Sequence, residues 1–484
     1  MRALSSSHRG ARSRIQLRLM VPSSGAPSLR ARRASRSPSG RPRREDALRR
    51  IRREEGEEPT AGSGPLRARC LASEAERREH FPVRALTLEG VDYLASPEAG
   101  EALAALAAGP AKSLDSLATL EALRRRHGPE RAAWLLDQAR LRRRAQGKFP
   151  PGPLLFEAEA LEMASAREVA AWRARRLLPF GRVLDLGAGV GGDTLALAAA
   201  GLEVVAVERD PVRAALLAHN LRVAGCAARV EVCCADWTGG AFDGAARAAF
   251  VDPARRRGGR RTVRLADGTP PLSAVLALAE HLDTVLFKAA PGVDRGEVPA
   301  GAGLEFVSLR GELKEALLSF GAARPEGAGA RAVVLPGGEV LAPSGPEPPA
   351  RVASPGAWLY EPDPAVLRAG QVRALGARLD AWQLDPEVAY LTGDRAVETP
   401  FARRWRVLRA GRFGGRKELA RWLRAEGAGP VTVRGRGVPV DFEGLARRLP
   451  RARGGPPRTV FLSRSPAGPL AILAAACSGA EEAE

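Results

Sequence analysis

Cysteine, histidine and long apolar runs are scarce in this 484-residue chain. The five cysteines are Cys70, Cys226, Cys233, Cys234 and Cys477. Their number is odd and none forms a C-x-x-C pair, which predicts a protein of a reducing, cytoplasmic compartment and excludes a disulfide framework or a zinc ribbon. The five histidines are scattered without metal spacing, so we expect no metal site. The longest nearly pure apolar run, residues 469–477, is shorter than the about 18 residues that a membrane span needs, so we expect no membrane association.

Lysine is also rare, with five lysines against 70 arginines among the 75 basic residues. This usage is typical of a GC-rich coding sequence, so the overall formal charge of +20 is weak evidence by itself. The distribution of this charge along the chain is more informative. Residues 1–50 carry 14 arginines and 2 acidic residues, and residues 401–460 carry 16 basic and 4 acidic residues. A local excess of this kind indicates contact with an anionic partner.

Composition and periodicity divide the chain into four parts. Residues 1–78, rich in Arg, Ser, Pro and Gly, predict a basic, disordered extension, with a targeting or nucleic-acid-binding tail as the alternative. Residues 79–178 predict a helical domain. Residues 179–345 alternate strands with helices, and residues 346–478 have the pattern of an α+β domain. The fold class is therefore α/β, with an added domain on each side.

The expected elements can be placed by residue range. Helices are predicted at 113–126, 129–144 and 156–178, with a capping box between Ser165 and Glu168. Strands are predicted at 182–186, 203–208, 229–234, 248–252, 284–288 and 304–309, with helices at 193–200, 211–224 and 272–281 between them. This alternation indicates a parallel sheet covered on both faces. In the last part we expect helices at 364–379 and 415–426 and strands at 431–433 and 460–462.

A glycine-rich loop follows the first predicted strand, in the sequence Asp-Leu-Gly-Ala-Gly-Val-Gly-Gly-Asp-Thr from Asp185 to Thr194. Glycines allow the backbone to turn tightly and to approach a ligand. The loop also satisfies the G-x-G-x-x-G pattern of dinucleotide enzymes, so Asp185 decides between the two interpretations. Its carboxylate would repel a pyrophosphate but suits the cationic methionine end of S-adenosylmethionine (SAM).

Two further carboxylates follow the next two strands. Glu208 ends the second strand, where a carboxylate can bind both ribose hydroxyls. Asp236 follows the third strand and precedes Trp237, in a position to accept a hydrogen bond from an adenine amine. The predicted cofactor-binding residues are Asp185, Gly187, Gly189, Gly191, Asp193, Thr194, Glu208, Asp236 and Trp237.

This block resembles the class I SAM-dependent methyltransferases, and within them the trimethylguanosine synthase type of RNA methyltransferase. The resemblance implies a Rossmann-like methyltransferase domain. It also implies that Asp185, Gly187 and Gly189 hold the methionine part of SAM, Glu208 the ribose and Asp236 the adenine, with Trp237 beside the ring.

The fourth strand ends at Asp252 and Pro253, which are the predicted catalytic residues. Enzymes that methylate exocyclic amines of bases resemble one another here, with Asp, Asn or Ser followed by two prolines and an aromatic residue that stacks on the base. This chain has Ala254 and Arg255 instead of the second proline and the aromatic residue. Arg255, Arg256 and Lys288 are predicted to bind a phosphate-bearing substrate.

The wider layout resembles bacterial class I methyltransferases with a C-terminal THUMP-like domain. The matching stretches include Lys148-Phe-Pro, Asp252-Pro-Ala-Arg-Arg, Tyr360-Glu-Pro-Asp-Pro, Leu391-Thr-Gly-Asp-Arg and Val433-Arg-Gly-Arg-Gly. This resemblance implies a methyltransferase that acts on an RNA base, in tRNA or rRNA, with the C-terminal unit binding RNA. Trp405, Phe413 and Trp422 lie within the basic stretch, either as RNA contacts or as core residues.

Two alternatives stay open from the sequence. One is a methyltransferase of a small phosphorylated metabolite or of a protein. The other is an RNA-binding protein whose methyltransferase domain is inactive, which the missing second proline and aromatic residue would explain. The sequence gives no oligomeric state.

Overall fold

The computed structural model describes residues 85–239, 246–253, 256–257, 260–261 and 264–476. The predicted extension, residues 1–78, and the predicted substrate residue Arg255 lie outside the described residues. From Leu86 onward the chain forms one compact unit.

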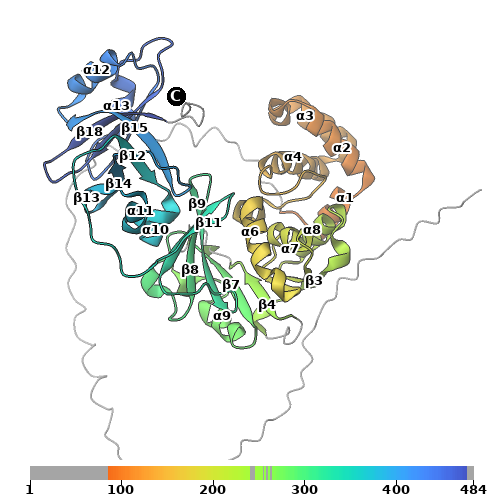
Figure 1. The fold of residues 1–484 in the computed structure, drawn as a ribbon. Coiled ribbons are helices and arrows are strands. Elements are labelled where there is room, and N and C mark those ends of the chain that lie inside the picture. Colours follow the sequence, from red (N-terminus) through yellow and green to blue (C-terminus); the bar gives the residue numbers. More distant parts are fainter. Residues whose placement is uncertain (1–84, 240–245, 254–255, 258–259, 262–263, 477–484) are drawn as a thin grey trace, which may run out of the picture. The chain divides into compact units, whose positions relative to one another are not determined.

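The first part of this unit is helical, as predicted (Figure 1). Its helices are α1 (Leu88–Leu94), α2 (Pro97–Ala108), α3 (Leu117–His127), α4 (Pro129–Arg144), α5 (Ala158–Met163) and α6 (Arg167–Leu177). The single helix expected over 156–178 is interrupted between α5 and α6. The predicted capping box is also wrong, because α6 begins at Arg167 and the hydroxyl of Ser165 instead accepts a hydrogen bond from Arg173.

The helical part shares a hydrophobic core with the sheet that follows it. Asn220 of α8 (Pro211–Val223) joins the two: its amide nitrogen donates to Leu155 O and Val190 O, and its Oδ1 accepts from Leu155 N. Buried amide groups of this kind are stable only when their hydrogen bonds are satisfied. The helical part is therefore a layer of the same unit that is fastened to the glycine loop.

The central sheet has nine strands in the order β11-β10-β8-β9-β7-β4-β1-β2-β3. The strands are β1 (Arg182–Leu186), β2 (Glu203–Glu208), β3 (Val230–Cys234), β4 (Ala248–Val251), β7 (Thr284–Ala289), β8 (Gly303–Leu309), β9 (Glu312–Gly321), β10 (Ala330–Leu335) and β11 (Glu339–Leu341). The six predicted strands are all present, and β3, β2, β1, β4 and β7 are parallel neighbours. The sequence analysis missed three strands. One is β9, which runs antiparallel between β7 and β8, and the others are β10 and β11, which lie beyond β8.

Helices cover both faces of this sheet. Successive strand residues accordingly alternate between two hydrophobic cores, one on each face. In β2, Val204 and Ala206 belong to one core, and Val205 and Val207 belong to the other. The first core includes residues of α6, α7 (Gly192–Ala199) and α8, and the second includes residues of α9 (Leu272–Ala279) and α10 (Pro364–Ala369). The carboxyl ends of the parallel strands therefore stay open between the helical layers.

The C-terminal part contains a second sheet of seven strands in the order β13-β14-β12-β15-β18-β17-β16. Its elements are β12 (Trp358–Pro362), α10, α11 (Val372–Leu379), β13 (Trp382–Asp385), β14 (Val388–Gly393), β15 (Ala402–Arg412), α12 (Arg416–Ala425), β16 (Val431–Arg436), α13 (Phe442–Arg448), β17 (Arg458–Ser463) and β18 (Leu470–Ala476). The α+β class is as predicted. The helix expected over 364–379 is split at Gly370, whose φ of 65° ends α10.

The aromatic residues of the basic stretch belong to the cores of this part. Trp422 is buried, and Phe413 packs against the same cluster under α12 and α13. Trp405 packs edge-on against Phe461, with 5.2 Å between the ring centroids. Trp422 is thus a core residue, and Phe413 and Trp405 lie half-buried against the cores, which supports the interpretation of these rings as core residues.

Candidate functional site

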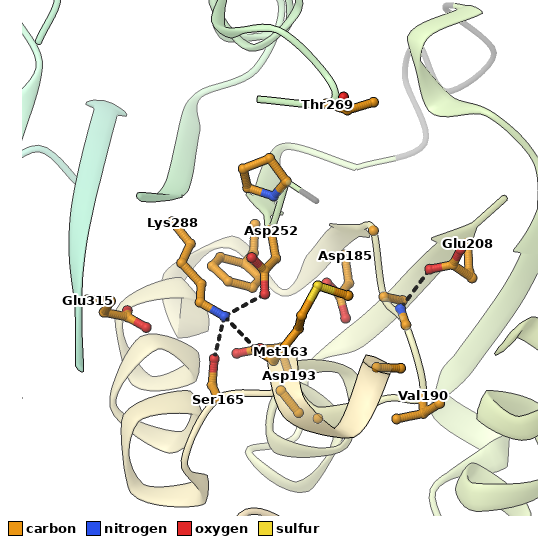
Figure 2. Close-up of a pocket in the computed structure, with 18 of the residues that line it drawn as sticks. Met163, Ser165, Asp185, Val190, Asp193, Glu208, Asp252, Thr269, Lys288 and Glu315 are labelled. Atoms are coloured by element: carbon orange, nitrogen blue, oxygen red, sulfur yellow. Dashed lines mark hydrogen bonds and ion pairs between the residues drawn. The ribbon is translucent and has the colours of Figure 1, made fainter. Parts of the chain in front are cut away.

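A cavity of about 760 Å³ lies at the carboxyl ends of β1, β2, β3, β4 and β7 (Figure 2). It takes a residue from the end of each strand: Asp185, Glu208, Asp236, Asp252 and Lys288. Because these strands are parallel neighbours, their ends meet at one edge of the sheet. The structure therefore brings together the side chains that the sequence singled out one by one.

The glycine loop forms one wall of the cavity. A Cβ on Gly187, which has a φ of 85°, would lie 2.7 Å from the carbonyl oxygen of Asp252, so only glycine allows this approach to β4. A Cβ on Gly189 would meet no atom within 4 Å, which leaves space for a ligand there. Gly191 has a φ of 98° and packs against Leu217, so it shapes the loop from behind the cavity wall.

Asp185 has a buried carboxyl oxygen without a partner in the protein, which indicates a ligand beside it. Its side chain is buried, its Oδ2 accepts from Thr194 Oγ1 at 2.5 Å, and its Oδ1 has no partner. Burial, and next to it the charge of Asp193, raises the pKa of Asp185 to about 8, with a further contribution from Asp252. A buried, unpaired acceptor is costly, and a cation placed beside it would remove that cost. The site thus fits the cationic methionine end of SAM.

Thr194 and Asp193 were both predicted to contact a cofactor; in the structure both have partners within the protein, and that contact stays a prediction. Thr194 is completely buried and serves Asp185 through its hydroxyl. Asp193 lines the cavity, but its Oδ1 accepts from Nε of Arg173 at 3.1 Å and also pairs with the same guanidinium through Nη2. Both residues therefore hold the wall of the site.

Glu208 and Asp236 line the next part of the cavity together with Trp237. Glu208 Oε2 accepts from Gly189 N at 2.9 Å, which ties the end of β2 to the glycine loop. Asp236 Oδ1 accepts from both the backbone N–H and the hydroxyl of Thr238, and these hydrogen bonds hold the pKa of Asp236 below its usual range. It is therefore a charged acceptor at the tip of β3 at neutral pH.

Arg173 is the main residue of the site that the sequence analysis missed. It is almost completely buried, and its guanidinium pairs with Asp193 and Glu315, donates to Ser165 Oγ at 2.7 Å, and lies over the ring of Phe250. A signal for it was present, since Arg173 occupies the apolar stripe of α6, four residues after Val169 and four before Leu177. A charged residue at such a position indicates a buried partner.

Asp252 and Lys288 form an ion pair at the centre of Figure 2, with 2.6 Å between Oδ2 and Nζ. Lys288 also donates to Ser165 Oγ at 3.0 Å and to Met163 O at 3.3 Å. An ammonium group has three N–H donors, so all three are used within the protein. Lys288 therefore has no N–H donor left for the substrate phosphate that it was predicted to bind.

The structure places the remaining predicted residues as follows. Pro253 lines the cavity next to Asp252. In the arginine run after it, residues 256–257 and 260–261 pair as two short antiparallel strands, with Arg256 opposite Arg261. The side chain of Arg256 lies outside the described residues, as all of Arg255 does. Their predicted role in substrate binding stays a prediction.

The described lining of the cavity is acidic, although the chain has a net charge of +20. Its eight acidic residues are Glu162, Asp185, Asp193, Glu208, Asp236, Asp252, Glu312 and Glu315. Its five basic residues are Lys148, Arg209, Arg213, Lys288 and Lys314. This balance favours a cationic ligand over an anionic one.

Two searches of the described part of the chain complete the site. No group of three or more His, Cys, Asp or Glu side chains there is arranged to hold a metal ion. None of the helices described is long and apolar enough to cross a membrane.

Comparisons with known proteins agree with this geometry. Residues 180–279 match the family described as RNA cap guanine-N2 methyltransferase, residues 402–476 match the family described as THUMP domain-like, and residues 87–145 match a domain of unknown function. A candidate methyltransferase of Porphyromonas gingivalis W83 has a similar structure, with a TM-score of 0.60 at 22% identity over 72% of this chain and 92% of its own. That likeness concerns the fold alone.

Two sequence relatives extend the comparison to function. Each is an uncharacterized SAM-dependent methyltransferase of Mycobacterium tuberculosis, from strains CDC 1551 and H37Rv. Each is 39% identical to this chain over 368 residues, which is 73% of this chain and 98% of the relative. Because so close a match runs through nearly the whole of these relatives, the chain belongs to the class I SAM-dependent methyltransferases with a C-terminal THUMP-like domain, and SAM is its cofactor.

Proposed function

We propose that the enzyme transfers the methyl group of SAM to an amino nitrogen of an RNA base. The observation that carries this proposal is Asp252, a charged acceptor held at the tip of β4 in the same cavity as Asp185 and Glu208. The matches to an RNA cap guanine-N2 methyltransferase family and to a THUMP domain-like family support RNA as the substrate.

SAM would lie across the carboxyl ends of β1, β2 and β3, and the carboxylates there would set the order of its methionine, ribose and adenine parts. Asp185 Oδ1 and the loop at Gly187 and Gly189 would hold the methionine part. Glu208 would accept hydrogen bonds from the ribose, and Asp236 one from the adenine amine, with Trp237 beside the ring. SAM supplies an electrophilic methyl group on a sulfonium, which needs no further activation beyond alignment with a nucleophile.

Asp252 would orient the acceptor. Its Oδ2 is fixed by Lys288, and about a fifth of its side chain remains exposed in the cavity. A carboxylate there accepts one N–H of an amino group and leaves the nitrogen lone pair directed at the methyl group. Alignment of this kind accounts for a large part of the rate in a transfer reaction.

The C-terminal part would bind the RNA outside the cavity. Arg403 and Arg406 of β15 are exposed, whereas Arg404 lies half-buried with its guanidinium 5.0 Å from the centre of the Trp358 ring. Arg403 also approaches Gly311, in the turn between β8 and β9, and β9 contributes Glu312 and Glu315 to the cavity. A nucleic acid on β15 would therefore lie next to a strand that lines the active site.

A transfer experiment tests the proposal. The purified full-length protein is incubated with methyl-tritiated SAM and with the RNA, protein and metabolite fractions of a strain that lacks the gene. We expect label in RNA, on an exocyclic amine. Label in protein or metabolites alone would favour the second class of substrate, and SAM binding without label in any fraction would favour an inactive methyltransferase domain.

A further inference from the structure

Lys288 is a buried lysine in a chain that uses arginine almost everywhere else. Its side chain is 4% exposed, and its three donors reach Asp252 Oδ2, Ser165 Oγ and Met163 O. Charged side chains are buried to this extent only when they are paired and hydrogen-bonded. Lys288 satisfies both conditions entirely within the protein.

The distribution of lysines adds an independent observation. Three of the five lysines in the chain, Lys148, Lys288 and Lys314, line this cavity, while Arg209 and Arg213 are the only arginines among the described residues that do. Arginine is what the composition supplies by default, so the cavity selects lysine. An ammonium is compact and points three donors in different directions, whereas a guanidinium is planar and larger. The three separate acceptors around Lys288 match the first geometry.

We propose that Lys288 is a positioning residue that holds Asp252 in the orientation needed to receive the acceptor N–H; this rests on the proposed function of Asp252. By occupying Oδ2, Lys288 leaves the other carboxylate oxygen for the substrate. Ser165 and Met163 fix the ammonium in turn, so the carboxylate is held by a lysine that is itself held in place.

The support behind Lys288 is continuous with the wall of the cofactor site. Ser165 accepts from Arg173, and Arg173 pairs with Asp193 at the start of α7. A chain of charged and polar contacts thus joins Asp252, directly after β4, to α6 and α7. Side chains held by such supporting contacts on regular elements keep their geometry better than side chains on free loops.

Lys288 also contacts the segment between α5 and α6, so a purely structural role must be separated from a positioning role. Glu168 supplies the control, because it lies in the first turn of α6, accepts from Arg310 Nη2 at 3.0 Å and does not line the cavity. Replacement of Glu168 by Met would loosen the start of α6 next to this segment and leave the Lys288–Asp252 pair in place.

A double-mutant cycle tests the proposal in the full-length protein. The variants are Lys288→Met, Asp252→Asn and the two combined, with Glu168→Met as the control. Each is assayed for turnover with methyl-tritiated SAM and total RNA, for SAM affinity by calorimetry, and for melting temperature. Met fills nearly the volume of Lys and removes the positive charge together with the three donors.

We expect Lys288→Met to lower turnover by about ten- to a hundredfold, since a misplaced reacting group costs on this order. SAM affinity should stay within about threefold of the wild type, because Lys288 acts on the acceptor side. The combined variant should be no slower than Asp252→Asn within about twofold, as expected when one residue acts through the other.

Three results would overturn the proposal. The losses of the two single variants could multiply in the combined variant, Glu168→Met could reproduce the loss of turnover, or Lys288→Met could keep full turnover. If wild-type protein labels a protein or metabolite fraction and no RNA, the proposed substrate is wrong and the cycle is run on the labelled fraction. Protein that labels no fraction would overturn both proposals.

Discussion

The cavity and strand β15 differ in how far their charged side chains are buried. Behind the cavity wall, Arg173 is 1% exposed and bonded to the lining residues Asp193, Glu315 and Ser165. On β15, Arg406 is exposed on the outer surface of the C-terminal part. Two guanidinium groups of the same chain therefore work in very different surroundings.

This difference sets the size of the effects that each region can have. Breaking a buried ion pair leaves an uncompensated charge in a medium of low dielectric constant, which is costly for stability. Exposed charges contribute little to stability, are screened by salt, and act together on a charged partner. The cavity should therefore respond strongly to single substitutions, and β15 only to several at once.

The largest expected effect is on stability. Arg173→Met would leave Asp193 and Glu315 buried without their cation and should lower the free energy of unfolding by about 3–5 kcal/mol. Arg182→Met is the matched control, because Arg182 pairs with Glu203 and Glu231 at an exposed site and should cost at most about 1 kcal/mol. Urea unfolding of both variants measures the difference. Equal losses would remove the contrast between the two surroundings.

The next effect is on turnover. Asp252→Ala should lower the rate of methyl transfer by on the order of a hundredfold or more, because the acceptor loses its alignment. SAM affinity should stay within about threefold, since Asp252 faces the acceptor. Turnover, SAM affinity and melting temperature are measured on one preparation. A variant that melts earlier but keeps its specific activity would show that Asp252 only supports the strand end.

The cofactor carboxylates should show effects of about ten- to a hundredfold on affinity, the range for a lost charged hydrogen bond. Asp185→Ala and Glu208→Ala should each weaken SAM binding to this extent in calorimetry. NAD should not bind the wild type, because Asp185 faces the place where its phosphates would lie. Binding of NAD without binding of SAM would contradict the assignment of the site.

The same residue gives a pH dependence. In the free protein the pKa of Asp185 is raised to about 8, so the carboxyl group is mostly neutral at pH 6. A cationic ligand favours the ionised form, so binding releases a proton and affinity should rise with pH by up to about tenfold per unit below pH 8. Asp185→Asn should bind SAM weakly with a flat profile between about pH 5.5 and 7.5. A flat profile in the wild type would mean that SAM does not contact this carboxylate.

The sequence predicted the part of the site that follows from strand order. Asp185, Glu208, Asp236 and Asp252 each end or follow a predicted strand, and parallel neighbours place such ends together. The six strands could be located because each is a short apolar run between turn signals. The strand order and the antiparallel β9 depend on long-range pairing, which local patterns do not contain.

The sequence did not predict which charged residues support others. Lys288 was expected to face a substrate phosphate, but its donors are taken by Asp252, Ser165 and Met163. Ser165 itself fitted a helix cap and instead joins Lys288 to Arg173. These partners lie more than a hundred residues from Lys288 along the chain or on neighbouring strands, so no local spacing identifies them.

The smallest effects per residue are expected on β15, where single substitutions should change little. Reversing Arg403, Arg404 and Arg406 together to Glu should reduce the affinity for every RNA tested, because the contacts are to phosphates rather than to bases. Wild-type affinity for tRNA or rRNA fragments should fall steeply between about 50 and 200 mM salt, and the triple variant should show a shallower slope as fewer counterions are released. Filter binding of the full-length proteins at several salt concentrations measures both. Unchanged affinity and slope in the triple variant would mean that RNA, if it binds, contacts another surface and that the arginines of β15 reflect composition alone.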